Sequence, residues 1–209
     1  MSDFDDDEYE SFDADGAGQQ TGPATTPLLD VHPDDADDDT DEDDEDDLED
    51  AAEDEIDFVI SAHREDGQPL VQALAADLAN DLEELIVQLR RLPGDAGALG
   101  FVSLVEEVFV IVRVRGQHVQ VLLNDGAAAG DWPIARDVAD LLGEDIPDED
   151  ESEPMGDLAI LADLGMSELD LSSLVDDLDL GSDQVLIEIA DKINLNPQFQ
   201  RVAELAFRS

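Results

Sequence analysis

Residues 98–125, ALGFVSLVEEVFVIVRVRGQHVQVLLND, decide the fold, because they form the long run of this chain that is richest in β-branched and aromatic residues. Such runs, interrupted by short polar connections, predict β-strands. Glu106-Glu107 and Gly116-Gln117 each supply two residues for a hairpin turn, and glycine in the first turn position is typical of a type II′ turn. The stretch therefore predicts three antiparallel strands.

The predicted register divides the side chains between two faces of the sheet. With the second turn at Gly116-Gln117, Val114 lies opposite Val119 and Val112 lies opposite Val121. Because alternate residues point to the same side, one face is apolar and needs a cover. This valine face comprises Val108, Val110, Val112, Val114, Val119, Val121 and Leu123.

The segment before this run predicts one strand and the cover. Residues 56–63, IDFVISAH, alternate and predict a strand, with Phe58, Ile60 and Ala62 on one face. Asp66-Gly67 is a turn sequence. From Leu70 to Leu89, leucines recur every three or four residues, which predicts an amphipathic helix of about six turns that packs on the valine face.

The remainder of the chain predicts short helices. Residues 131–142 predict a helix that is capped by Asp131, carries Pro133 in its first turn and ends at Gly143. Further helices are predicted in the segments 156–164, 167–178 (capped by Ser167 or Ser172), 182–193 (capped by Ser182) and 196–206 (capped by Asn196). None is long enough to be stable alone, so they should pack on one another or on the sheet.

Charge is distributed unevenly. The chain has 58 acidic and 9 basic residues, a net charge of −49, and the first 55 residues hold 26 of the acids and neither Lys nor Arg. Such a segment repels itself and buries little apolar area, which predicts disorder. Its apolar island, residues 27–31, is either a short docking motif or a few apolar residues in a coil.

These patterns together predict an α+β fold. Its centre is a small antiparallel sheet in the element order β-α-β-β-β-α, followed by a C-terminal cluster of short helices and preceded by the disordered acidic tail. The predicted parts are a tail at 1–55, an α+β domain at 56–143, an acidic linker at 144–155 and a short-helix region at 156–209.

Composition excludes several classes of function. The chain has no Cys, which excludes disulfides, thiolate zinc sites and cysteine nucleophiles, and favours a cytoplasmic location. No apolar run approaches the ~18 residues of a membrane span. Direct nucleic-acid binding needs a basic footprint, which this chain lacks. Strong acidity favours basic partner proteins, or solvation in high salt.

Catalytic, cofactor-binding and metal motifs are not recognisable. His63-Arg64-Glu65 matches the H-x-E half of the nucleobase deaminase signature, but the other half requires cysteines. Asp177, Asp179 and Asp183 do not have the spacing of a calcium loop. We therefore predict a protein that is not an enzyme and has no cofactor.

A candidate partner-binding patch lies on the face opposite the valines. The register places Arg115 opposite His118 and Arg113 opposite Gln120, which is the densest basic group in this acidic chain. One interpretation is a solvated sheet face, on which the arginine stems cover apolar neighbours. The other is a binding patch for the acidic tail or for a carboxylate of a partner.

Several segments of the chain are distinctive: the strands FVIVRVRG and HVQVLLND, the following GAAAGDWPIARDVADLLG, the acidic linker and, most specifically, GDLAILADLGMS at residues 156–167. Together they resemble the bacterial tRNA adenosine deaminase-associated proteins. The resemblance extends over residues 56–205. It implies a strand-helix-strand-strand start, short C-terminal helices and an association with the deaminase, and it implies no catalytic residues.

The resulting functional hypothesis is a non-catalytic cytoplasmic protein that binds tRNA adenosine deaminase, or another basic protein, by protein–protein contact. A rival hypothesis is nucleic-acid mimicry, in which the Asp-rich tail occupies a basic RNA-binding surface and competes with the nucleic acid.

Overall fold

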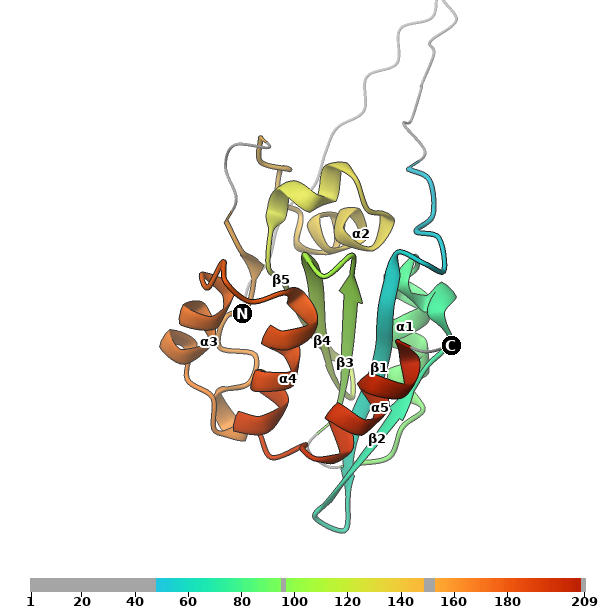
Figure 1. The fold of residues 1–209 in the computed structure, drawn as a ribbon, viewed down its shortest axis with the longest axis vertical. Helices are drawn as coiled ribbons and strands as arrows, with labels where there is room; N and C mark the ends of the chain where they lie inside the picture. Colours follow the sequence, from blue (N-terminus) through green and yellow to red (C-terminus); the bar gives the residue numbers. More distant parts are fainter. Residues whose placement is uncertain (1–47, 95–96, 149–152, 208–209) are drawn as a thin grey trace, which may run out of the picture. The chain divides into compact units, whose positions relative to one another are not determined.

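A six-stranded antiparallel sheet forms the centre of the protein. The computed structural model describes residues 48–94, 97–148 and 153–207, so the disorder predicted for residues 1–47 lies outside the described part. The strand order is β2-β1-β3-β4-β5-β6 (Figure 1). The strands are β1 Ile56–Glu65, β2 Gln68–Ala73, β3 Ala98–Leu104, β4 Val108–Arg115, β5 His118–Leu123 and β6 Met155–Gly156. The α+β class is confirmed; β2 and β6 were not predicted.

Residues 70–81, the first part of the predicted helix, do not form an α-helix. Asp66 and Gly67 both have positive φ, 51° and 78°, as in a two-residue type I′ hairpin, and Gly67 adopts this conformation without steric cost. β2 therefore folds back along β1, and the α-helix begins only at α1, Leu82–Arg90. A spacing of four residues suits a strand of period two as well as a helix, and the hairpin decides between them.

Strands β3, β4 and β5 form the predicted meander. Val114 lies opposite Val119 and Arg113 opposite Gln120, as predicted. The first connection differs, because Leu104 pairs with Val108 and the turn therefore has three residues, 105–107, instead of two.

The valine face is covered by helices, as predicted. Its cover consists of α1, α2 (Pro133–Leu142) and the 3-10 segments η1 (Ala76–Ala79) and η2 (Gly126–Gly130). The buried helical side chains are Leu82, Leu85, Ile86, Leu89, Ile134, Ala135, Val138 and Ala139. Leu70, from the first half of the predicted helix, is instead 42% exposed on β2.

The ends of α2 agree in part with the sequence. Pro133 is the first helical residue and Gly143 caps the C-terminus, as predicted. Asp131 is not the N-cap, since Trp132 occupies that position. Leu141, in the last turn of α2, is 51% exposed.

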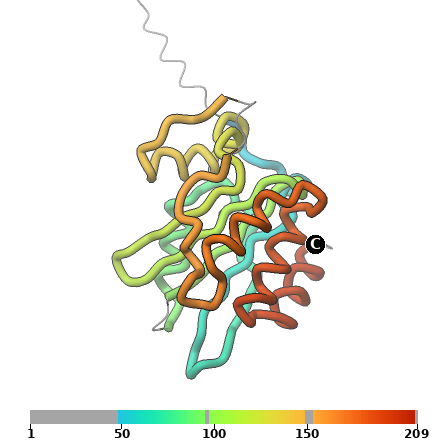
Figure 2. The backbone as a smooth tube through the Cα atoms, turned by 90° about the vertical axis from the view of Figure 1, so that its left-hand side faces the viewer, coloured from blue at the N-terminus to red at the C-terminus, as the bar shows by residue number. Residues whose placement is uncertain are grey.

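The opposite face is covered by the C-terminal helices α3 (Glu168–Val175), α4 (Ser182–Lys192) and α5 (Gln198–Ala206) (Figures 1 and 2). Phe199 of α5 packs edge-to-face on Phe101 of β3, with ring centroids 5.1 Å apart. The expectation that these short helices pack on one another or on the sheet is confirmed.

Local structure within the C-terminal region differs from prediction. Residues 156–164 form the end of β6, turns and the 3-10 segment η3 (Ala162–Leu164) instead of a helix. Ser167 caps α3, as predicted. Ser182 is the first residue of α4, and its Oγ lies 2.7 Å from Ser103 Oγ instead of capping the helix. Asn196 precedes α5 and accepts a hydrogen bond from Gln200 N at 3.3 Å.

Residues 48–55, which the sequence assigns to the acidic tail, are fixed against the domain. Ala51 is 7% exposed. The Asn80 side chain accepts a hydrogen bond from Ala51 N at 2.8 Å and donates one to Ala51 O at 3.2 Å. Order therefore extends to the N-terminal side of Ile56.

Among the described residues, no helix has the length and apolar character that crossing a membrane requires.

Candidate functional site: a neutralised arginine pair and an acidic cleft

Arg113, the centre of the predicted basic patch, is buried. It is 1% exposed and donates to both carboxylate oxygens of Asp163 in η3, with Nη2 and Oδ2 2.8 Å apart. Its Nη1 also donates to Ile160 O at 2.6 Å. The hydrogen bond from Arg113 lowers the pKa of the Asp163 carboxyl below its ordinary value. Asp163 of the same chain is therefore the carboxylate partner of Arg113.

The other three patch residues lie nearer the surface. Arg115 donates to Gln120 Oε1 at 2.9 Å, and its Nη1 lies 3.7 Å from Asp163 Oδ2. Gln120 in turn donates to Asp157 Oδ2 at 2.6 Å. His118 is exposed at the hairpin. The structure thus brings Arg113, Arg115 and Gln120 into one network and leaves Arg115 and His118 accessible.

The two acids of this network come from the GDLAILADLGMS segment. Its backbone follows β5 closely, with Asp157 N donating to Val121 O at 2.9 Å. Gly156 has a φ of 106°, and a Cβ there would lie 2.3 Å from Val121 O, so this approach requires glycine. The segment neutralises the arginines and extends the sheet. Sequence reasoning missed this role because the paired residues lie some 50 positions apart.

A second surface feature is an acidic cleft of about 420 Å³, which we call the Leu178 cleft. Glu106 and Glu107 line it from the β3–β4 turn, and Asp177 and Asp179 line it from the loop between α3 and α4. Leu178 lies between those aspartates and is 96% exposed. The cleft thus combines four acidic residues with one almost completely exposed leucine.

The turn that presents Glu106 has an unusual backbone conformation. Val105 and Glu106 have φ values of 47° and 57°, which costs on the order of 1–2 kcal/mol for a β-branched residue. Several hydrogen bonds hold the turn, among them those from Glu106 N to Asp57 Oδ2 at 2.8 Å, from Val105 N to Glu55 O at 2.9 Å and from Ser182 N to Glu106 O at 2.8 Å. They fix the Glu106 side of the cleft relative to α4.

Comparison with known proteins identifies the family. A model of the Rv3753c-like tRNA adenosine deaminase-associated protein family matches residues 57–196. The chain belongs to this family. Protein Rv3753c of Mycobacterium tuberculosis (strain ATCC 25618 / H37Rv) is 31% identical to it over 151 residues, which are 70% of this chain and 87% of that protein. No solved structure matches the chain. The resemblance inferred from sequence is confirmed.

The part of this family member that matches, residues 57–196, contains both the arginine network and the Leu178 cleft. The family is described as associated with the deaminase, not as a deaminase.

The His63-Arg64-Glu65 motif does not form a site in the fold. His63 is buried while Glu65 is exposed at the end of β1. Within residues 48–94, 97–148 and 153–207, no group of three His, Cys, Asp or Glu side chains could hold a metal ion.

The Leu178 cleft was missed at the level of sequence for an identifiable reason. The sequence predicts a helix over residues 167–178, which includes Leu178, but α3 ends at Val175. Aspartates at positions 176, 177 and 179 surround Leu178. That density of charge could have indicated a solvent-exposed loop.

Proposed function

We propose that this protein is a non-catalytic cytoplasmic partner of tRNA adenosine deaminase and acts through protein–protein contact. Family membership carries the proposal, because the family is described by that association. A protein that binds tRNA needs a basic surface. The Leu178 cleft supports the proposal, since its carboxylates around an exposed leucine complement a basic surface with an apolar centre.

Copurification of the full chain with its cognate deaminase tests the proposal. We expect association at about 50 mM and about 150 mM NaCl and a marked loss at about 0.5 M, because salt screens contacts between exposed charges. An absence of association at both lower concentrations would refute the proposed function.

Variants of the cleft test where contact occurs. Asp177→Asn combined with Asp179→Asn, and separately Leu178→Ala, should weaken association roughly tenfold, in the range of a buried contact residue. The charge control is Glu144→Gln with Asp145→Asn, which removes two exposed charges elsewhere. The apolar control is Leu169→Ala, since Leu169 is 77% exposed on α3. If the variants and the controls weaken association with the deaminase equally, the Leu178 cleft is not the site of contact.

Deletion of residues 1–47 separates contact by the folded part from mimicry by the Asp-rich tail. The deletion stops before Leu48 because Ala51 is part of the core. Contact through the folded part predicts that association is retained. Mimicry predicts that association, and competition with tRNA, is lost.

A further inference from the structure

The sheet edge formed by β1 is covered over only part of its length. β2 pairs with β1 from Glu65 back to Ile60 and ends at Ala73. The last hydrogen bond runs from Leu74 N to Val59 O at 2.8 Å. Within the described residues, the 56–58 segment has β3 on one side and no strand on the other.

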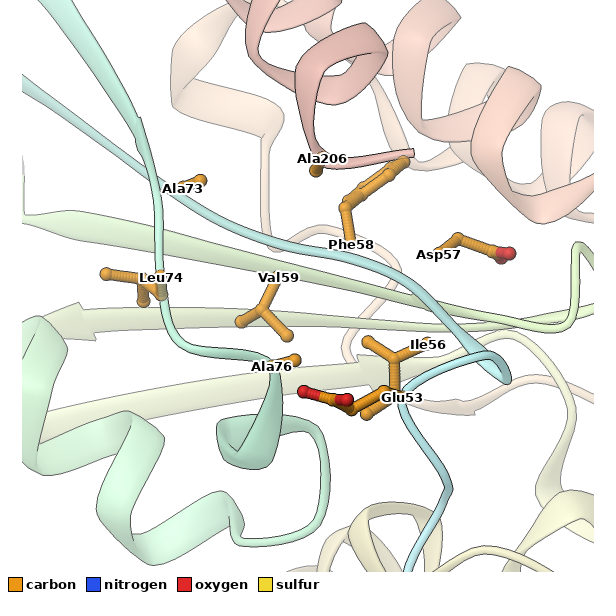
Figure 3. Close-up of a pocket in the computed structure, with 9 residues that line it drawn as sticks. All are labelled: Glu53, Ile56, Asp57, Phe58, Val59, Ala73, Leu74, Ala76 and Ala206. Atoms are coloured by element: carbon orange, nitrogen blue, oxygen red, sulfur yellow. The ribbon is translucent and has the colours of Figure 1, made fainter. Parts of the chain in front are cut away.

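A groove of about 300 Å³ lies along this uncovered edge (Figure 3). Figure 3 shows Phe58 and Ala206 on one side of β1, and Ile56, Val59 and Leu74 on the other. The groove therefore reaches both faces of the sheet and the main-chain edge between them. A continuation of β2 would occupy this position.

The rim of the groove carries negative charge. Glu53 is exposed and extends its side chain beside Ala76 (Figure 3). Asp57 also lines the groove, but its carboxylate points away and accepts hydrogen bonds from Ser103 Oγ and Glu106 N, both at 2.8 Å. Among the described residues that line the groove, none is Lys or Arg. An apolar groove with an exposed carboxylate at its end favours a basic residue next to an apolar one.

We propose that this groove binds an extended, basic and apolar segment of a partner protein, which adds a strand to β1 at residues 56–58. Added strands bind by main-chain hydrogen bonds, and pockets for alternate side chains give specificity. Three strand residues span about 10 Å, so the site takes a tripeptide core. One apolar side chain packs at Phe58 on one face, another packs at Val59 on the other, and a Lys or Arg approaches Glu53.

Charge selects among the possible occupants. The net charge of −49 opposes the approach of a second copy, and the acid-rich residues of this chain would meet Glu53 with like charge. The inference rests on the proposed function, in that the partner is a basic protein.

Two other edge strands of the sheet, β2 and β6, are poor sites for strand addition. Pro69 lies in β2, where it removes a donor from the outer edge, and β6 has two residues. Residues 56–58 contain no proline, and their edge adjoins the apolar groove. The edge at residues 56–58 is therefore better suited to binding an added strand than the edges of β2 and β6.

The experiment uses a defined probe, the blocked peptide acetyl-KVKLKV-amide, added to isotope-labelled full-length protein at about 0.5 M NaCl to suppress non-specific attraction. We expect saturable amide shift changes at Ile56–Val59 and Ala73–Ala76. No binding, or shift changes confined to residues 1–47, would overturn the inference.

Matched variants separate groove binding from general attraction by charge. Ala73 and Gln72 are neighbouring exposed residues of β2, and of the two Ala73 lines the groove. Ala73→Trp should weaken peptide binding at least tenfold, whereas Gln72→Trp should change it by less than twofold. Glu53→Lys should weaken binding more than Glu144→Lys. Equal effects within either pair would contradict the inference.

Main-chain recognition is tested with two peptides that are N-methylated at alternate residues. One of them should bind at least tenfold more weakly than the other, because successive amides of a strand point to opposite sides. Equal affinities would refute strand addition.

The proposed function and the groove inference can be refuted independently of each other. If the deaminase copurifies but the peptide does not bind at 56–59, the groove inference is wrong and the proposed function stands. If the peptide binds there but no deaminase associates, the proposed function is wrong and the groove remains a peptide-binding edge.

Discussion

Arg113 is a buried cation whose main partner, Asp163, is only half-buried, with its side chain 54% exposed. Asp163→Ala would leave the guanidinium buried without its carboxylate, so we expect a loss of about 2 kcal/mol in the free energy of unfolding. Arg113→Met combined with Asp163→Ala should recover most of this loss, because it also removes the buried charge. Urea unfolding followed by circular dichroism measures both. A double variant no more stable than Asp163→Ala would contradict this account.

The same pair has a defined pH dependence. The pKa of the Asp163 carboxyl is lowered in the folded protein, so its stabilisation is present above the ordinary value of 3.8 and is lost as pH falls through the folded-state pKa. The stability difference between wild type and Asp163→Ala should therefore narrow below pH 3.8.

The pKa shift of Asp137 has the opposite sign to that of Asp163. Burial raises its pKa, and Asp81, Asp140 and Glu83 add repulsion, although its Oδ2 accepts a hydrogen bond from Leu82 N at 3.1 Å. The native state then binds more protons than the unfolded state above pH 3.8, so stability falls as pH rises through the folded-state pKa.

Asp137→Asn keeps an acceptor for Leu82 N and removes the charge. We expect its Tm at pH 7 to rise by roughly 1–3 °C, and the gain to vanish at pH 3.8 and below. Asp140→Asn, an exposed position on the same helix, is the control. A larger gain from Asp140→Asn would show that burial is not the cause.

At the scale of elements, residues with only local partners were predicted well. The register of β4 and β5 follows from one two-residue turn, which placed Arg113 opposite Gln120 correctly. Helix α4 lies where the sequence predicts a helix, at residues 182–193. The helix predicted for residues 70–81 is wrong, because a four-residue spacing fits the period of a strand as well as that of a helix, and the Asp66-Gly67 hairpin favours the strand.

The helix predicted for residues 156–164 does not form, for a different reason. The Asp157 side chain accepts a hydrogen bond from Ala159 N at 2.8 Å, and Ile160 O and Asp163 bind Arg113. Such side-chain contacts compete with helix formation. The sequence alone does not predict which segment covers Arg113, because Arg113 and Asp163 lie on segments that only the tertiary fold brings together.

Gly156→Ala tests the close approach of this segment to β5. The substituted residue would have an unfavourable φ, and its Cβ would collide with Val121 O, so we expect a loss of roughly 2 kcal/mol or more. Gly130→Ala is the control, since nothing lies within 4 Å of a Cβ there. Thermal unfolding measures both, and hydrogen exchange at Asp157 N should rise in Gly156→Ala. Similar stability of the two variants would contradict the assignment.

At the scale of the whole molecule, charge repulsion opposes compactness. The net charge of −49 makes the folded chain repel itself, and added salt screens this repulsion, with a Debye length of about 10 Å at 0.1 M and about 3 Å at 1 M. We therefore expect Tm to rise with NaCl and to level off near 0.5–1 M, where screening is nearly complete.

Solvation in high salt, the alternative source of this acidity, predicts a different curve. A protein adapted to concentrated salt should continue to gain stability at several molar KCl, beyond the range in which screening still changes. Chains with and without residues 1–47 should be compared, because the deletion removes acids and spares the core that includes Ala51. If repulsion dominates, the shorter chain has the higher Tm at low salt and the two curves converge as salt increases. Parallel curves that keep rising would assign the acidity to solvation and would weaken the argument that charge alone selects a basic partner.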